Sequence, residues 1–212
     1  MRKLPVYLVL DVSASMQGDP IDAVRKGVKN LVAALRKDPY AIETAYLSVI
    51  TFNHEAYQEI PLTELAFFQE PKIDASGQTG LGSALNLLSI CIENEVQTTS
   101  VDSKGDWKPL VFLMTDGAPT DDWKKGLATF KNQQCGLVVA CAAGPYADIS
   151  VLREITKDLV SLDSADEDSI AAFFKWVSAS VSVTSTKIEL NSQQSSALSQ
   201  LPPPPPEVNI VV

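Results

Sequence analysis

Short apolar segments alternate with amphipathic segments along most of this chain, and this alternation is the feature that most restricts its fold. It predicts strands over residues 4–10, 45–52, 56–62, 110–114, 137–143 and 159–162. It predicts helices over residues 20–37, 81–96, 122–134, 149–157 and 170–181, with a loop over 63–80. Such alternation requires right-handed crossovers between parallel strands. The expected fold is therefore α/β and doubly wound, with a mostly parallel central sheet, helices on both faces and one antiparallel edge strand at 56–62.

Aspartate and proline residues mark several of the expected helix ends. Asp19 followed by Pro20 fits an N-cap with proline in the first helical position. Asp38 and Pro39 are expected to end the same helix, because proline cannot continue it. Asp121 is expected to cap the helix over 122–134.

The composition changes after Val183, first to Ser, Gln and Thr and then to an uninterrupted run of proline at 202–206. This segment has too few apolar residues for a packed core, and the prolines favour a stiff polyproline II conformation. We therefore expect one domain over residues 1–183 and a C-terminal tail over 184–212. Residues 201–212 should be dispensable for the fold, although 208–212 are β-prone enough to add to a sheet edge.

Charge and cysteine content restrict the cell compartment and the partners. Seventeen basic and 26 acidic residues give a net charge of -9, which disfavours nucleic acid and anionic membranes. The apolar run at 4–10 resembles the start of a signal peptide, but Asp11 ends it and no small-residue cleavage site follows. No segment approaches the ~18 apolar residues of a membrane span. Cys91, Cys135 and Cys141 lack paired or metal-type spacing, so we expect free thiols and a cytoplasmic protein.

Oxygen-bearing side chains follow two of the expected strands and precede one helix. The first strand ends in Asp11-Val12-Ser13-Ala14-Ser15, and the strand over 110–114 ends in Thr115-Asp116-Gly117, with Thr79 placed before the helix at 81. Each motif alone is explained by a turn or a helix cap. Together, at one edge of a parallel sheet, they predict a site for a hard divalent cation in surface loops, where replacing Asp11 should leave the fold intact. Its five candidate ligands are Asp11, Ser13, Ser15, Thr79 and Asp116.

The order D-x-S-x-S, then T, then D resembles the metal-ion-dependent adhesion site of the von Willebrand factor type A domain family. The five candidate residues match that pattern without departure. The segments LPVYLVLDVSASMQGDPIDAV, TDGAPTDDW and LPPPPPEV are further similar to the TerY group of bacterial tellurium-resistance proteins. This resemblance implies a Rossmann-like fold and a role in tellurite or stress resistance, alongside kinase-like and phosphatase-like proteins.

The family resemblance also implies roles for the five residues. Ser13 and Ser15 would bind the metal directly, Asp11 would act mostly through water, and Thr79 and Asp116 would alternate between direct and water-mediated contact. The cation would be Mg²⁺ or Mn²⁺ in preference to Ca²⁺. An Asp or Glu side chain of a partner protein would take the open coordination position.

Two other function classes remain open from the sequence. The first is a metal-dependent phosphohydrolase that uses the same cation. It is disfavoured because Ser13 stands where a haloacid-dehalogenase-like phosphatase needs a second aspartate after Asp11, and because the single histidine, His54, lies in an expected hairpin turn. The second is a structural scaffold whose metal site is vestigial. Phosphate-loop and dinucleotide motifs do not occur in the sequence, so we expect a protein that is not an enzyme.

Overall fold

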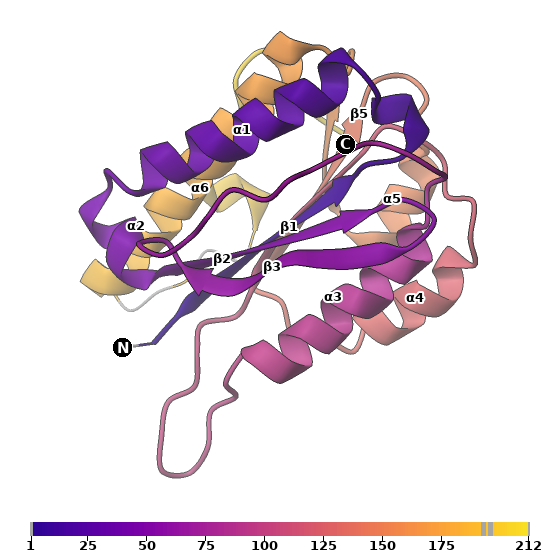
Figure 1. Cartoon of the computed structure of the whole chain (residues 1–212). Coiled ribbons are helices and arrows are strands. Elements are labelled where there is room, and N and C mark those ends of the chain that lie inside the picture. The colour runs from indigo at the N-terminus through magenta and orange to yellow at the C-terminus, as the bar shows by residue number, and fades with distance from the viewer. Residues whose placement is uncertain (1, 192–193, 195–196, 212) are drawn as a thin grey trace.

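The computed structural model describes residues 2–191, 194 and 197–211, and its centre is a seven-stranded sheet (Figure 1). The strands are β1 (Leu4–Asp11), β2 (Ala45–Phe52), β3 (Ala56–Glu64), β4 (Leu110–Thr115), β5 (Leu137–Ala143), β6 (Asp158–Leu162) and β7 (Asn209–Ile210). Their order across the sheet is β3-β2-β1-β4-β5-β6-β7. The five inner strands are parallel, whereas β3 and β7 are antiparallel. The expected fold class is confirmed, with antiparallel strands at both edges where only one was expected.

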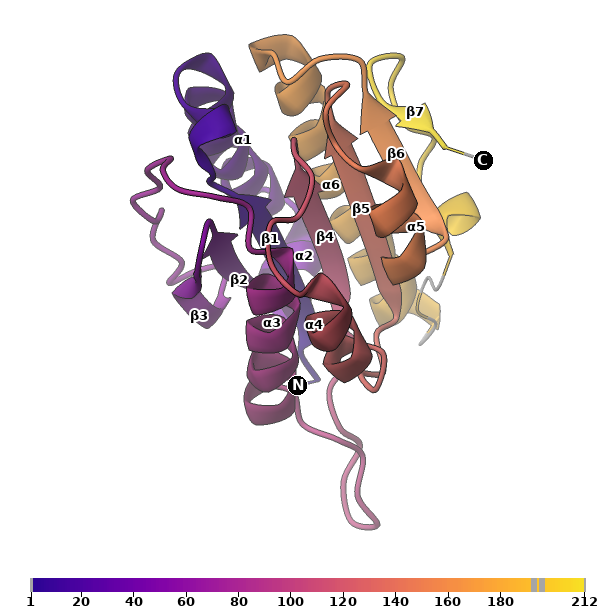
Figure 2. The ribbon, with the colours of Figure 1, turned by 90° about the vertical axis from the view of Figure 1, so that its right-hand side faces the viewer.

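Helices cover both faces of this sheet (Figure 2). One face carries α1 (Asp19–Leu35), α2 (Pro39–Thr44) and α6 (Glu167–Asn191), and the other carries α3 (Leu81–Glu95), α4 (Trp123–Phe130) and α5 (Ile149–Ile155). Two short 3-10 turns, η1 (Ala14–Met16) and η2 (Leu198–Gln200), complete the regular structure of the described residues.

Strand β1 is buried along its whole length, which explains why its sequence is continuously apolar. Leu8 and Leu10 pack into the core below α1 and α6, whereas Tyr7 and Val9 pack into the core below α3 and α4. Successive side chains of a strand point to opposite faces, so a strand with helices on both sides needs apolar residues at every position.

The ends of the first helix differ from the sequence expectation. Helix α1 begins at Asp19 itself and is preceded by Gly18, whose φ of 84° is a left-handed conformation that suits glycine. The helix ends at Leu35. Asp38 then caps a new helix, because its Oδ1 accepts hydrogen bonds from Tyr40 N at 2.9 Å and Ala41 N at 3.0 Å. Helix α1 ends before Asp38 and Pro39, and the same pair also starts α2, which was not expected.

The C-terminal segment packs on the domain more extensively than its composition predicts. Helix α6 extends to Asn191, ten residues beyond its expected end. Leu201 and Val208 are buried in the main core, and Trp176 Nε1 donates a hydrogen bond of 2.8 Å to the carbonyl of Pro202. Strand β7 pairs antiparallel with β6, as the β-prone sequence at 208–212 suggested. The expectation that these residues contribute no core packing is wrong.

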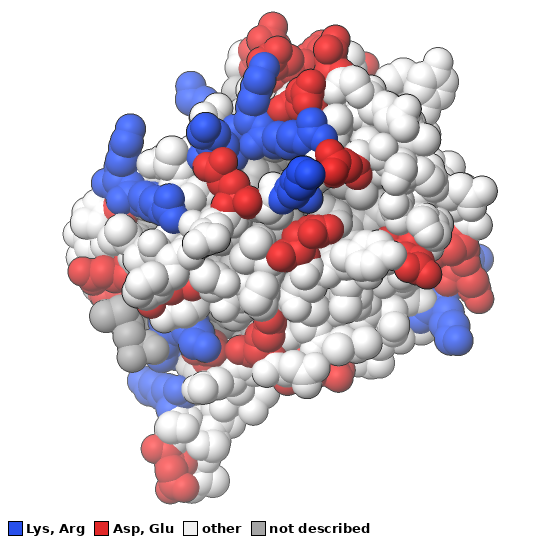
Figure 3. Space-filling model, viewed as in Figure 1, with Lys and Arg blue, Asp and Glu red and all other residues white. Residues whose placement is uncertain are grey.

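Surface charge and thiols agree with the composition. Basic and acidic side chains are intermixed on the face that carries α1, not separated into patches (Figure 3).

All three cysteines are free, with Cys91 and Cys141 buried and Cys135 half-buried. Burial raises the pKa of Cys135 to about 12, so this thiol stays protonated and unreactive at neutral pH. Within the described part of the chain, the helices are all too short or too polar to cross a lipid bilayer.

Candidate metal centre

The candidate site lies at the carboxyl ends of β1 and β4, where the order of strands in the sheet reverses. Leu10 of β1 pairs with Met114 of β4, so the two strands end side by side. Asp11 is the last residue of β1, Thr115 is the last of β4, and Asp116 follows directly. Such a reversal point opens a crevice between the loops and is the usual ligand position in doubly wound sheets.

The turn after β1 folds back on the Asp11 carboxylate. Asp11 Oδ1 accepts a hydrogen bond of 2.8 Å from Ser13 N, and Asp11 Oδ2 accepts one of 2.5 Å from Thr115 Oγ1. The hydroxyls of Ser13 and Ser15 lie 3.0 Å apart, and Ser15 Oγ donates to Asp116 Oδ1 at 2.8 Å. The side-chain oxygens of Ser13, Ser15 and Asp116 therefore form one chain, and the backbone N–H of Ser13 joins Asp11 to it.

Thr79, the fifth candidate, reaches the same place from the irregular segment that precedes α3. Its carbonyl accepts hydrogen bonds from Thr120 N at 2.9 Å and from Thr120 Oγ1 at 3.2 Å. A methyl group placed on Gly117 would lie 3.3 Å from Thr79 Oγ1. The threonine hydroxyl thus lies against the backbone that follows Asp116, and the structure brings all five predicted residues together.

Backbone hydrogen bonds hold two of the three loops in register. Ser76 N donates to the carbonyl of Val12 at 2.8 Å, and Ala14 N donates to the carbonyl of Gly77 at 3.0 Å. These two bonds join the segment that carries Thr79 to the turn that carries Ser13 and Ser15. The site is therefore built from two long-range connections and does not depend on a single loop.

Burial dominates the electrostatics of both carboxyl groups. Asp11 is 1% exposed, and burial raises its pKa to about 6, although hydrogen bonds from Thr115 and Ser13 oppose the shift and the nearby Asp116 adds to it. Burial likewise raises the pKa of Asp116, against the hydrogen bond from Ser15. The groups that shift these two pKa values include no basic side chain. The expectation that Asp11 occupies an exposed loop is wrong, since it closes a buried strand.

The donor set suits a hard divalent cation that keeps open coordination positions. Mg²⁺ binds six oxygens at about 2.1 Å, so neighbouring oxygens of its octahedron lie about 3.0 Å apart. The separations of 3.0 Å between the serine hydroxyls and 2.8 Å between Ser15 Oγ and Asp116 Oδ1 match that edge. Across the part of the chain that the structure describes, no group of three or more His, Cys, Asp or Glu side chains could hold a metal ion. The site thus offers hydroxyls and two carboxylates, which fit Mg²⁺ or Mn²⁺.

Two residues have contacts at or near the site that the sequence analysis did not assign to them. Thr115 holds Asp11 through its hydroxyl, and its place next to Asp116 at a strand end was the only local signal. Asp121 does not cap the helix that follows it. Its carboxylate accepts hydrogen bonds from Gly82 N at 3.0 Å and Ser83 N at 2.9 Å, so it caps α3, while Asp122 stands at the start of α4. This contact spans about forty residues and has no local sequence signature. His54 lies exposed between β2 and β3, as expected for a hairpin turn.

Comparison with known proteins agrees with this geometry. A family model described as the von Willebrand factor type A domain matches residues 6–175. No curated protein matches the chain significantly.

Several solved structures share the fold at low sequence identity. A von Willebrand factor type A protein from Catenulispora acidiphila is 16% identical, with a TM-score of 0.65 over 86% of this chain and 43% of its own. The pilus adhesin SpaC from Lactobacillus rhamnosus GG is 15% identical, with a TM-score of 0.65 over 86% of this chain and 30% of its own. Proximal thread matrix protein 1 of the mussel byssus, in a structure with a zinc-occupied MIDAS motif, is 17% identical. Its TM-score is 0.58 over 87% of this chain and 46% of its own. The chain thus spans less than half the length of each of these proteins.

Proposed function

This chain belongs to the von Willebrand factor type A domain family, and we propose that it is a protein-interaction module that binds its partner through a divalent cation. Domains of this family generally serve as interaction modules and not as enzymes. The cation would be held by Asp11, Ser13, Ser15, Thr79 and Asp116. The observation that carries the proposal is the pair of buried carboxylates, Asp11 and Asp116, which the Ser13–Ser15 turn joins through hydrogen bonds. No basic side chain is among the groups that shift their pKa values.

The hydrogen bonds of the site suggest a division of roles. Both oxygens of Asp11 already accept hydrogen bonds, from Ser13 N and Thr115 Oγ1, so this carboxylate orients the turn and reaches the cation through water. Ser13 and Ser15 would then bind directly through their hydroxyls. Thr79 and Asp116 lie on separate loops and would exchange between direct and water-mediated contact.

The proposed partner group is an Asp or Glu side chain. Hydroxyl ligands neutralise little of the charge of a divalent cation, so the bound ion attracts a further carboxylate. The net charge of -9 repels an acidic partner at long range, which makes the attraction short-range and dependent on the ion. Removing the cation should therefore weaken the complex far more than raising the salt concentration does.

Isothermal titration calorimetry tests the cation site. We expect the wild type to bind Mg²⁺ or Mn²⁺ with 1:1 stoichiometry, more tightly than Ca²⁺, and Zn²⁺ is included because the mussel matrix protein holds zinc in its MIDAS motif. Combined replacement of Ser13→Ala and Ser15→Ala should abolish binding, because it removes the two directly bound hydroxyls.

The chain offers a matched control for this double variant. Ser100 and Ser103 form another hydroxyl pair 3.0 Å apart, but in an exposed loop. Replacing both by alanine should leave metal affinity unchanged. Equal metal binding by the wild type and the Ser13/Ser15 double variant would contradict the proposed site.

The cellular role that we propose is tellurite or stress resistance in the cytoplasm, supported by the similarity of three segments to TerY proteins. Kinase-like and phosphatase-like proteins that accompany such proteins are the candidate partners. The test is growth on tellurite of a deletion strain complemented with the wild type or with the Ser13/Ser15 double variant. Equal resistance with both alleles would contradict a role that depends on the cation.

A further inference from the structure

The segment between β3 and α3, residues 65–80, carries Thr79 and has no regular secondary structure. It runs beside α1 (Figure 1) and inserts three apolar side chains into the core, those of Leu65, Phe68 and Ile73. Beyond Ile73 the segment has only polar and small side chains up to Thr79. Apart from Ala75, which packs against the core, hydrogen bonds therefore fix its last part.

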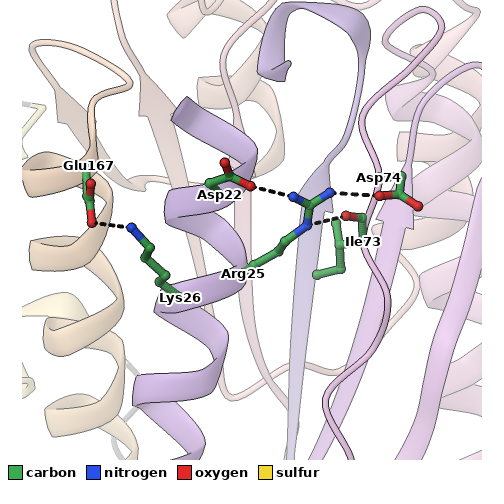
Figure 4. Close-up of polar contacts among 6 residues, drawn as sticks. All are labelled: Asp22, Arg25, Lys26, Ile73, Asp74 and Glu167. Carbon is green, nitrogen blue, oxygen red and sulfur yellow. Dashed lines mark hydrogen bonds and ion pairs between the residues drawn. The ribbon is translucent and has the colours of Figure 1, made fainter. Parts of the chain in front are cut away.

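Two arginines of the first helix region bind backbone carbonyls of this segment. Arg36 donates to Leu65 O at 2.9 Å and to Phe68 O at 2.5 Å, near the beginning of the segment. Arg25 donates to Ile73 O at 2.6 Å and to Asp74 Oδ1 at 2.8 Å, near its end (Figure 4). The two positions differ by 36 − 25 = 11 residues, or about three helical turns, so they lie on the same side of the helix.

The residues that follow the Arg25 contacts in the chain are hydrogen-bonded to the candidate metal site. Asp74, which Arg25 binds, is followed by Ala75, whose carbonyl accepts a hydrogen bond of 3.3 Å from Gln17 Nε2. The backbone bonds of Ser76 and Gly77 to the Asp11–Ser15 turn come next, and Thr79 lies two residues further on. Arg25 is thus the last side chain of α1 that donates hydrogen bonds to the segment before the segment reaches the site.

We propose that Arg25 is a positioning residue for Thr79, which it holds at the correct distance from Ser13 and Ser15 for metal binding. This inference rests on the proposed function of the site. Only arginine offers a planar fork that can donate to a carbonyl, to Asp74 and to Asp22 at the same time. Because the Asp74 side chain is 73% exposed, its ion pair adds little to stability, and the effect of Arg25 is mainly geometric.

Metal affinity measured by Mn²⁺ titration tests the inference, with Arg36→Ala as the matched control for Arg25→Ala. Both variants remove an arginine that binds carbonyls of the same segment. We expect Arg25→Ala to weaken Mn²⁺ binding about tenfold, as losses outside the ligand shell commonly do. Arg36→Ala should leave the affinity within about twofold of the wild type, because its contacts lie at the far end of the segment. Arg25→Lys, which keeps the charge but not the fork, should give an intermediate affinity.

A double-mutant cycle with Thr79→Val separates positioning from general stabilisation. Valine keeps the shape of threonine and removes its hydroxyl. If Arg25 acts through that hydroxyl, Arg25→Ala has no further effect on Mn²⁺ affinity in the Thr79→Val background. Unfolding in EDTA, followed by circular dichroism, verifies that each variant is folded, and Arg25→Lys carries the cycle if Arg25→Ala does not fold.

The outcomes are distinct. Three results would each overturn the role of Arg25 while leaving the metal site in place. They are equal losses of Mn²⁺ affinity in Arg25→Ala and Arg36→Ala, an undiminished effect of Arg25→Ala in the Thr79→Val background, and wild-type affinity in Arg25→Ala. Failure of the wild type to bind Mn²⁺ would overturn the proposed function and this inference together.

Discussion

Replacing Asp11 by asparagine should stabilise the metal-free protein and, at the same time, remove its response to Mg²⁺ or Mn²⁺. Asp11 is 1% exposed, and burial raises its pKa from 3.8 to about 6. Between these two pH values the folded protein holds this proton more tightly than the unfolded chain does. Stability is therefore lost as the pH rises through this window, and it stays low above it.

The size of the effect follows from the pKa shift. About two pKa units at 1.4 kcal/mol each correspond to about 3 kcal/mol of stability lost by neutral pH. Asparagine has the same shape, and its carbonyl can still accept from Ser13 N while its amide donates to Thr115 Oγ1. The loss of hydrogen bonds to a charged acceptor offsets part of the gain. We expect a net stabilisation of about 1–3 kcal/mol above pH 6.5, or roughly 2–10 °C in Tm.

Urea unfolding in EDTA between pH 4.5 and pH 8 measures this prediction. The free energy of unfolding of Asp11→Asn minus that of the wild type should grow between pH 4.5 and about pH 6.5 and stay constant above. Adding Mg²⁺ to about 100 times its Kd should raise the free energy of unfolding of the wild type by about 2.7 kcal/mol and leave that of Asp11→Asn unchanged. Asp102→Asn, which changes an exposed loop carboxylate, should follow the wild type throughout.

Parallel pH profiles of the wild type and Asp11→Asn in EDTA would refute the reasoning, because they would show that the buried charge does not cost stability. A full Mg²⁺ response in the variant would separately show that the Asp11 carboxylate is unnecessary for the site.

Three further predictions concern packing and caps. Gly126→Ala should destabilise the fold by about 2 kcal/mol or more in urea unfolding, because its added methyl would lie 2.2 Å from the carbonyl oxygen of Gly82 in α3. Asp121→Ala should cost about 1 kcal/mol in the same assay, because it removes the cap of α3. Truncation after Gln200 should lower the Tm by several degrees, because it exposes core that Leu201 and Val208 cover. An unchanged Tm after truncation would contradict this prediction and support the expectation of a dispensable tail.

Strands and the candidate site were predictable because each depends on a strong local signal. Buried parallel strands need continuous apolar runs, and all such runs end at the same edge of the sheet. Once residues 4–10 and 110–114 were identified as strands, the convergence of Asp11 with Asp116 followed from the topology. The hydrogen bonds among their hydroxyl neighbours required the structure.

Features that escaped prediction have physical reasons. Asp-Pro both ends and begins helices, so Asp38 was ambiguous from sequence alone. Helix α6 continues through a serine- and threonine-rich stretch because the hydroxyls bond within the helix: Ser180 Oγ donates to Trp176 O, and Thr184 Oγ1 donates to Ser180 O. The hydroxyls of Ser180 and Thr184 are therefore buried with a hydrogen-bond partner, whereas that of Ser185 is buried without one, and the composition alone suggests a solvated tail.

The pairing of β6 with β7 has a consequence for synthesis of the chain. Val160 pairs with Ile210, which lies 210 − 160 = 50 residues later. Because the ribosome adds roughly 5–20 residues per second, β7 is synthesised several seconds after β6, and the edge of β6 is unpaired for that time. During that interval an apolar strand offers unpaired N–H and C=O groups to neighbouring nascent chains. This edge of β6 therefore stays unpaired until β7 has been made.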